Sequence, residues 1–170
     1  KNQTLVKGIN LEGLRSLGDP IYFAKKYYEE GIDEIHYQDV VASLYGRNSL
    51  KEIISECVKN IFVAVCVGGG LRNLNDIDDV LKLGADKISL NSAAVRKPDL
   101  IKEAANVYGS STISISIEAI KYDDKYEVLI ESGREQTGIE LFSWIEKIQK
   151  YGAGEIILTS INNEGRKKGF

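Results

Sequence analysis

Short apolar runs alternate along the chain with longer stretches whose apolar residues recur at helical spacing. The apolar runs predict strands, and the stretches between them predict helices. The predicted strands cover residues 33–41, 61–69, 86–91, 112–119 and 155–161, and the predicted helices cover roughly 20–30, 49–59, 74–83, 98–107 and 139–150. Regular alternation of strands and helices indicates an α/β protein with a parallel sheet.

Prolines and glycines mark the ends of these helices. Pro20 and Pro98 suit a first helical turn, where the missing N–H has no partner to lose. A glycine follows four of the helices, as C-terminal capping favours, at Gly31, Gly84, Gly109 and Gly152.

Three segments share one pattern of helix-capping glycine, small or apolar residue, charged residue and isoleucine: GIDEIHYQD, GADKISLNS and GAGEIILTS. Strands begin near residues 34, 61, 87 and 112, a spacing of about 26 residues that is typical of a (β/α) barrel. A doubly wound sheet could show a similar but less regular spacing. The segment 121–132 predicts a small β-ribbon inserted after the fourth of these strands. Active sites of such barrels lie at the carboxyl ends of the strands, which makes the residues there candidates.

Composition narrows the class of protein. The 170 residues are 43% apolar and 28% charged with a net charge of −3, and no basic stripe suggests a nucleic-acid partner. No apolar run approaches the length of a membrane span and no leader is visible, so we expect a cytoplasmic protein. Cys57 and Cys66 are expected to be buried thiols. The single histidine, His36, is expected to lie in the core or line the barrel rather than to be catalytic.

Two polar loops at predicted strand ends are candidates for anion binding. The glycines of VGGGLRN, including Gly70, let backbone N–H groups approach an anion, although a tight turn alone would also use glycine. Asn91 and Ser92 can donate hydrogen bonds to phosphate or simply cap the helical turn that follows. A second polar loop follows the last strand at 162–169.

Together these loops suit a long substrate with a phosphate at each end. Asp39 and Glu118 end predicted strands between the loops and are candidates for acid–base chemistry. Lys7 lies in a glycine-flanked segment that can form a flap, although a solvated lysine is the commoner outcome.

Several motifs together resemble the family of imidazole glycerol phosphate synthase cyclase subunits. They are LVKGINLEGLRSLGDP, DVVAS, VGGGLRN, GADKISLNSAAV and GAGEIILTSINNEG, in order and in register from residue 5 onward. The resemblance implies a (β/α)8 TIM barrel, of which this chain covers the flap after the first strand through strand six. We therefore expect residues 1–170 to form one barrel domain that is incomplete at both ends.

The resemblance also implies a lyase reaction without metal or cofactor. Ammonia from a glutaminase subunit, bound as a heterodimer, attacks a bisphosphorylated ribulosyl aminoimidazole carboxamide (PRFAR), giving imidazole glycerol phosphate and AICAR. By matching positions, Glu118 and Lys7 are the catalytic residues. The substrate and its phosphates are bound at Asp39, Gly70, Asn91, Ser92, Glu164 and Gly165. Glu34, Lys87 and Glu155 match the charged gate through which ammonia enters the bottom of the barrel.

Two positions depart from the family pattern, because Glu118 and Glu164 stand where the family has aspartate. A longer acid moves its oxygen by roughly an ångström, enough to change the rate or the substrate. One alternative is a paralogous ammonia-using barrel, paired with a glutaminase-like protein in bacterial surface-polysaccharide amidation. A second alternative is a non-catalytic phosphate-binding barrel.

Overall fold

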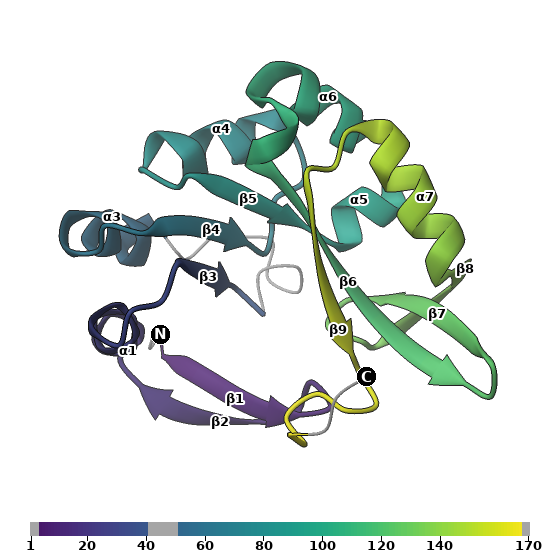
Figure 1. Ribbon diagram of the computed structural model, residues 1–170, viewed down its shortest axis with the longest axis horizontal. Coiled ribbons are helices and arrows are strands. Elements are labelled where there is room, and N and C mark those ends of the chain that lie inside the picture. Colours follow the sequence, from purple (N-terminus) through teal and green to yellow (C-terminus); the bar gives the residue numbers. More distant parts are fainter. Residues whose placement is uncertain (1–3, 41–50, 168–170) are drawn as a thin grey trace.

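The computed structural model of the protein describes residues 4–40 and 51–167 (Figure 1). Strands and helices alternate through most of this part of the chain. The strands are β1 Leu5–Ile9, β2 Glu12–Gly18, β3 Glu34–Gln38, β4 Ala64–Gly68, β5 Lys87–Leu90, β6 Ile113–Tyr122, β7 Lys125–Ile130, β8 Glu135–Glu140 and β9 Glu155–Ser160. The helices are α1 Pro20–Glu29, α3 Lys51–Asn60, α4 Leu74–Lys82, α5 Ser92–Arg96, α6 Asp99–Tyr108 and α7 Leu141–Tyr151, with a 3-10 turn, η1, at Ser110–Thr112.

Five strands form a parallel sheet in the order β3-β4-β5-β6, with β9 on the other edge of β6. The sheet is curved, and α1, α3, α4, α6 and α7 follow its outer side in sequence order (Figure 1). The predicted α/β class and parallel sheet are confirmed. The ends of two predicted elements, residue 41 and residues 49–50, lie outside the described residues.

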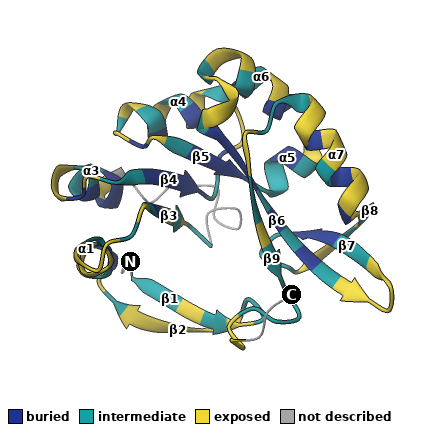
Figure 2. Ribbon diagram, in the orientation of Figure 1, coloured by how far each residue is buried: buried dark blue, intermediate teal, exposed yellow. Residues whose placement is uncertain are grey.

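The two faces of the sheet differ in polarity because side chains alternate along each strand. The outer face is apolar and packs against the helices, forming the core: it includes Val65, Val67, Ile88, Ile113 and Ile115. Figure 2 shows this layer as buried strand segments beneath helices whose far sides are exposed. By the strand register, the inner face carries small or polar side chains, including His36, Cys66, Ser89, Ser114 and Ser116.

Strand β6 is longer than predicted and has two partners on one edge. Its first residues pair with β5, and from Glu118 to Tyr122 it pairs antiparallel with β7. The ribbon predicted at 121–132 therefore exists with wider bounds, since β7 pairs in turn with β8. Strand β8 is absent from the sequence-based prediction, which began a helix at 139, and α7 starts instead at Leu141.

The segment before α1 forms a hairpin rather than a loop. Strands β1 and β2 pair antiparallel with each other and with no other strand of the described residues. The tip is docked on the loop after β9, where the backbone N–H of Asn10 donates to the Glu164 carbonyl over 3.1 Å. Figure 1 shows the hairpin facing the inner side of the sheet.

The predicted helix ends are largely confirmed. Pro20 opens α1, and each of the four predicted capping glycines has positive φ, between 85° and 106°. Both cysteines are buried as free thiols, as expected. Within the described ranges, no helix is long and apolar enough to cross a bilayer.

Candidate active site

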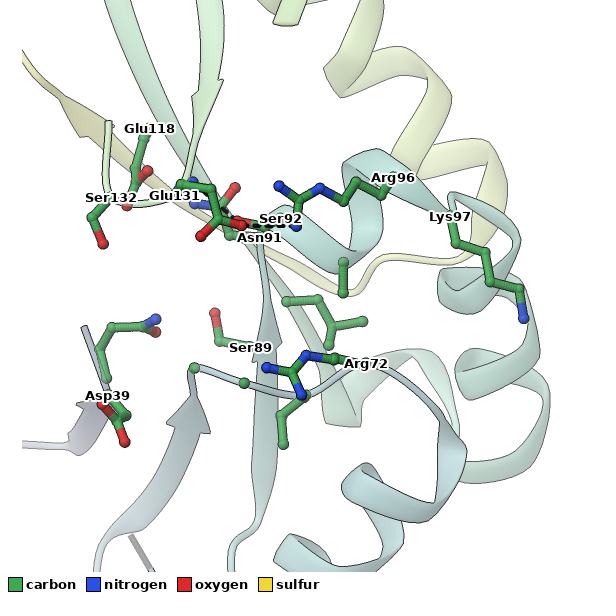
Figure 3. Close-up of a pocket in the computed structure, with 16 residues that line it drawn as sticks. Asp39, Arg72, Ser89, Asn91, Ser92, Arg96, Lys97, Glu118, Glu131 and Ser132 are labelled. Atoms are coloured by element: carbon green, nitrogen blue, oxygen red, sulfur yellow. Dashed lines mark hydrogen bonds and ion pairs between the residues drawn. The ribbon is translucent and has the colours of Figure 1, made fainter. Parts of the chain in front are cut away.

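The carboxyl ends of β3, β4 and β5, together with Glu118 within β6, surround a pocket with a volume of about 220 Å³ (Figure 3). Five of the residues predicted for the site line it: Asp39, Gly70, Asn91, Ser92 and Glu118. The structure thus brings the two motifs VGGGLRN and NSAAV to one pocket, because parallel strands all end at the same rim of the sheet.

Glu118 lies at the rim of the parallel sheet although its strand does not end there. Parallel pairing to β9 stops at Ala119, and β6 continues as a hairpin to Tyr122. The Oε2 atom of Glu118 accepts a 2.8 Å hydrogen bond from the Gly133 N–H, and the Asn91 side chain also bonds to this carboxylate. Burial raises the pKa of Glu118 against the effect of these two donors, and the nearby Glu131 carboxylate raises it further.

The glycine loop has a structural reason for part of its composition. Gly69 has φ of 95°, and a Cβ atom there would collide with the backbone carbonyl of Asp39. A tight turn therefore explains Gly69 by itself. Gly70 also has positive φ, at 74°, and lines the pocket, where its role in phosphate binding stays a prediction.

Capping does not explain the side chain of Asn91. The residue occupies the N-cap position of α5, but its side chain makes no capping hydrogen bond and turns to Glu118 instead. Its buried Oδ1 atom has no hydrogen-bond partner among the described residues. Ser92 Oγ accepts from the Glu131 N–H over 3.1 Å, which ties α5 to the turn after β7.

Four further residues of this pocket were missed by the sequence analysis. Arg72 and Arg96 supply positive charge, Ser89 places a buried hydroxyl without a partner among the described residues at the pocket floor, and Glu131 adds a second carboxylate. Arg72 lies inside the motif VGGGLRN, and Arg96 follows Ser92 by four residues, so both had a signal in the sequence. Glu131 had none, because it lies in the inserted ribbon.

A second cavity of about 290 Å³ separates the β1–β2 hairpin from the inner face of the sheet. Lys7 and Glu164 line it, and so does Glu118, which therefore borders both cavities. Glu164 Oε2 accepts a 2.8 Å hydrogen bond from the Leu11 N–H, so in this structure it holds the hairpin tip. Gly165 has φ of 71°, and a Cβ there would lie 2.7 Å from the Gly8 carbonyl oxygen.

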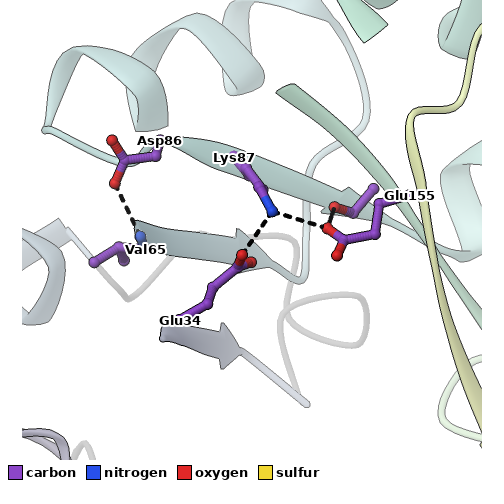
Figure 4. A network of polar contacts seen from close by, with 6 residues as sticks. Glu34, Val65, Asp86, Lys87 and Glu155 are labelled. Carbon is purple, nitrogen blue, oxygen red and sulfur yellow. Dashed lines mark hydrogen bonds and ion pairs between the residues drawn. The ribbon is translucent and has the colours of Figure 1, made fainter. Parts of the chain in front are cut away.

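The predicted gate residues form one cluster at the opposite rim of the sheet (Figure 4). Lys87 Nζ lies 2.6 Å from Glu34 Oε2 and 3.2 Å from Glu155 Oε2, and the Ser114 hydroxyl donates to Glu155 over 2.9 Å. The two carboxylates raise the pKa of Lys87, and the Ser114 hydroxyl and Lys87 lower the pKa of Glu155. Lys87 is therefore in contact with both of the other predicted gate residues.

The inner face between the gate and the pocket is polar. His36 points inward from β3 and borders the hairpin cavity, consistent with the expected lining role. Burial lowers the pKa of His36, against the effect of Glu34 and Glu155, which favours the neutral imidazole. Within residues 4–40 and 51–167, no group of three or more potential metal ligands gathers in one place.

Comparison with known proteins yields close relatives. The sequence profile of the histidine biosynthesis protein family matches residues 1–170. The chain is 46% identical over 171 residues to "Imidazole glycerol phosphate synthase subunit HisF" of Legionella pneumophila, covering all of this chain and 81% of that protein. Proteins of the same name from Campylobacter concisus and Prochlorococcus marinus (strain MIT 9312) are 42% and 43% identical. The chain covers 68% and 66% of their lengths.

Proposed function

The chain belongs to the histidine biosynthesis protein family, among the HisF cyclase subunits of imidazole glycerol phosphate synthase, and we propose that it uses ammonia to convert PRFAR to imidazole glycerol phosphate and AICAR. The fold of that family is a (β/α)8 barrel, and the five parallel strands belong to it. That residues 1–170 are a single domain, continued in the whole protein by further barrel strands, is part of the proposal.

The observation that carries the proposal is the position of Glu118 between two cavities. One cavity is lined by the glycine loop, Asn91 and Ser92, and the other by Lys7 and Glu164. A substrate with two phosphates can place one in each cavity, and its reacting centre then lies beside the shared carboxylate. Arg72 and Arg96 in the first cavity supply the positive charge that a phosphate requires.

The chemistry proposed for Glu118 follows from its surroundings. A buried carboxyl with a raised pKa retains its proton closer to neutral pH, so it can act as a general acid. Its two hydrogen bonds, from the Gly133 N–H and the Asn91 side chain, fix its direction. Lys7 on the hairpin would contact the substrate from the opposite side of the second cavity.

The name of the relatives includes the word "subunit", which implies a complex with a partner subunit. We propose that the partner is a glutaminase, that the two form a heterodimer in the cytoplasm, and that the whole acts as a glutamine-dependent lyase. The cluster of Glu34, Lys87 and Glu155 supports this, because it lies at the rim of the sheet opposite the pocket. Ammonia released there could reach the pocket along the polar inner face.

One alternative has an observation in its favour. Glu118 and Glu164 stand where the resemblance leads us to expect aspartate. The carboxylate of Glu164 accepts a hydrogen bond from the Leu11 N–H at the hairpin tip. A paralogous barrel that keeps the ammonia gate and acts on a surface-polysaccharide precursor would show such changes around its substrate.

The test uses the purified full-length protein that contains this chain, PRFAR and an ammonium salt at mildly alkaline pH. We expect AICAR to form, and Glu118→Gln to lower kcat by about 10²–10⁴-fold, the usual contribution of a general acid. Glu118→Asp, which restores the expected side chain, is the matched control and should remain active.

Two results would count against the proposal. Failure of the unmodified protein to form AICAR would rule out PRFAR as its substrate and favour the polysaccharide alternative. Ammonia-dependent turnover that Glu118→Gln leaves intact would remove the role of Glu118. Any turnover that this substitution abolishes excludes the non-catalytic phosphate-binding barrel.

A further inference from the structure

The turn that joins β7 to β8 has an unusual backbone. Glu131, Ser132 and Gly133 have φ values of 54°, 59° and 75°, so three consecutive residues are left-handed and two of them are not glycine. Residues with a Cβ atom avoid this region, because Cβ crowds the neighbouring carbonyl oxygen. Such a conformation persists only where surrounding contacts fix it. The turn is therefore held in place by its neighbours.

The backbone of the turn closes a ring of hydrogen bonds with the end of β5 and with β6. The Gly133 N–H donates to Glu118 Oε2 over 2.8 Å. The Glu131 N–H donates to Ser92 Oγ over 3.1 Å. Asn91, which precedes Ser92, bonds to the same Glu118 carboxylate through its side chain. Asn91 and Ser92 are thus connected to Glu118 twice, once directly and once through the turn.

An ion pair also fastens the Glu131 side chain to α5. Its Oε1 atom lies 2.9 Å from Nη1 of Arg96, and the side chain is only 14% exposed. Arg96 follows Ser92 by four residues, so both lie on one face of α5. Figure 3 shows the Glu131 carboxylate facing the guanidinium of Arg96. The backbone and the side chain of Glu131 are therefore both attached to α5.

Other neighbours leave the turn little room to move. The Ser132 hydroxyl donates to the Val40 carbonyl over 3.3 Å. A Cβ atom added at Gly133 would lie 3.2 Å from side-chain carbons of both Leu11 and Ile161, closer than ordinary van der Waals contact. The Gly133 N–H that reaches Glu118 is therefore packed from behind as well as tied at the start of the turn.

We propose that Glu131 is a positioning residue: it holds the turn so that the Gly133 N–H aims the Glu118 carboxyl, and it couples that aim to the phosphate bound at Ser92. This role rests on the proposed function. Ser92 accepts from the turn through its oxygen, so its hydroxyl hydrogen stays available to a phosphate oxygen. Phosphate binding and alignment of Glu118 therefore use the same short helix without competing for one atom.

The length of the Glu118 side chain gives this device its purpose. Glutamate has one methylene more than the aspartate of the family pattern, and so one more rotatable bond to be fixed. A displacement of about 1 Å in a reacting group can cost about 10²-fold in rate. Supporting hydrogen bonds keep such a group in its productive geometry. The Gly133 N–H and the Asn91 side chain supply two of them.

The first experiment measures hydrogen exchange at the Gly133 amide in the purified full-length protein without substrate. We expect exchange to be about tenfold faster or more in Glu131→Gln, because the turn loses its tie to α5. Arg96→Gln should have the same effect, and the double variant should exchange no faster, because both substitutions break one pair. Glu135→Gln is the matched control: Glu135 also pairs with Arg96, over 3.1 Å, but it is 54% exposed.

The second experiment measures turnover of PRFAR with an ammonium salt. We expect Glu131→Gln to lower kcat by about 10–100-fold while KM for PRFAR changes only a few-fold, since the substrate contacts remain and the acid is misaligned. Glu135→Gln should keep kcat within a few-fold of the unmodified protein. Thermal unfolding of each variant shows that folded proteins are compared, and a merely structural role would not separate kcat from KM.

The possible failures are distinguishable. Exchange at Gly133 that Glu131→Gln leaves unchanged would overturn this inference and leave the proposed function intact. Faster exchange with unchanged kcat would also overturn it, because catalysis would then not need the turn. A rise in KM with unchanged kcat would assign Glu131 to substrate binding instead. No AICAR from the unmodified protein would overturn the proposed function, which the exchange experiment does not test because it uses no substrate.

Discussion

At the scale of single residues, burial and hydrogen bonding act in opposite directions on the pKa of the Glu118 carboxyl. Burial dominates, so the pKa of Glu118 is raised even though a backbone N–H and an amide favour its charged form. The ionised group is thus costly to the folded state. Active sites commonly trade stability for reactivity in this way.

The stability of Glu118→Gln should therefore depend on pH with a definite sign. A folded-state pKa above the unfolded value of 4.5 means that the unmodified protein loses stability as pH rises through the folded pKa. Because glutamine stays neutral, the variant should unfold at a higher temperature than the unmodified protein at pH 7–8.

The difference in unfolding temperature between the variant and the unmodified protein should shrink as pH falls below 4.5, because Glu118 is then protonated in both the folded and the unfolded state. Thermal unfolding from pH 4 to 8 measures it, with the exposed Glu135→Gln as the control that should show little change. A Glu118→Gln variant that is less stable at pH 8 than at pH 4, relative to the unmodified protein, contradicts the assignment.

Residues at the ends of strands were the most predictable part of the site. Asp39, Gly70, Asn91 and Ser92 could be named because each follows a strand, and parallel strands all end at one rim. Glu131 could not, since it sits 39 residues from Ser92, the hydroxyl to which its N–H donates. The register of an inserted ribbon decides that contact.

At the scale of elements, the β1–β2 hairpin is hydrogen-bonded to the rest of the described residues at its tip. Glu164 holds the tip: its carboxylate accepts a hydrogen bond from the Leu11 N–H, and its backbone carbonyl accepts one from the Asn10 N–H. Arg166 Nε adds a 2.9 Å hydrogen bond to Asn10 Oδ1. A hairpin whose hydrogen bonds to the rest of the described residues lie at its tip is a suitable cover for the cavity that Lys7 lines.

Removing the Glu164 carboxylate should loosen this tip. A hydrogen bond to a charged group contributes about 1.5–3 kcal/mol, so hydrogen exchange at the Leu11 amide should be about tenfold faster or more in Glu164→Ala. Glu12→Ala, an exposed change in the same hairpin, is the control, and unchanged exchange at Leu11 would refute the role of Glu164.

The two antiparallel elements were also the least predictable from sequence. Six of the seven residues of β2 are exposed, so this strand has no alternation of apolar and polar positions to reveal it. Strand β8 alternates only between exposed and half-buried positions. Their strand character comes from pairing with a neighbour, which a local pattern does not record.

At the scale of the whole molecule, the pocket and the charged cluster lie at opposite rims of one sheet. The cluster of Lys87, Glu34 and Glu155 is partly exposed, so its net contribution to stability is small, about 1 kcal/mol or less. The inner face between the rims carries mainly small and polar side chains, with Ile157 among them, whereas barrel interiors are usually filled by branched apolar side chains. This arrangement is what passage of ammonia from a partner would need.

Lys87→Ala should therefore uncouple glutamine hydrolysis in the partner subunit from the reaction in the pocket. In the complex with the partner subunit, we expect glutamine-dependent turnover to fall several-fold more than turnover with an ammonium salt, because only the former uses the gate. Lys82→Ala is the control, since that lysine pairs with Asp78 on the exposed surface of α4. Equal losses with both nitrogen sources would contradict channelling.

The sequence by itself determined the order of the parallel strands and of the longer helices between them. Alternating apolar and polar positions are a local property, and they fix which side of each strand meets the helices and which faces inward. The same pattern placed Glu118 at a rim and Glu34, Lys87 and Glu155 at the other.

Only the tertiary structure decided which side chains share a pocket. Glu131 meets Arg96 and Ser92, and Glu164 meets Leu11, across long stretches of chain. These contacts depend on strand register and on turns with positive φ, which are set by packing of the whole molecule. Glu118 is a buried candidate acid beside a second carboxylate because of that packing.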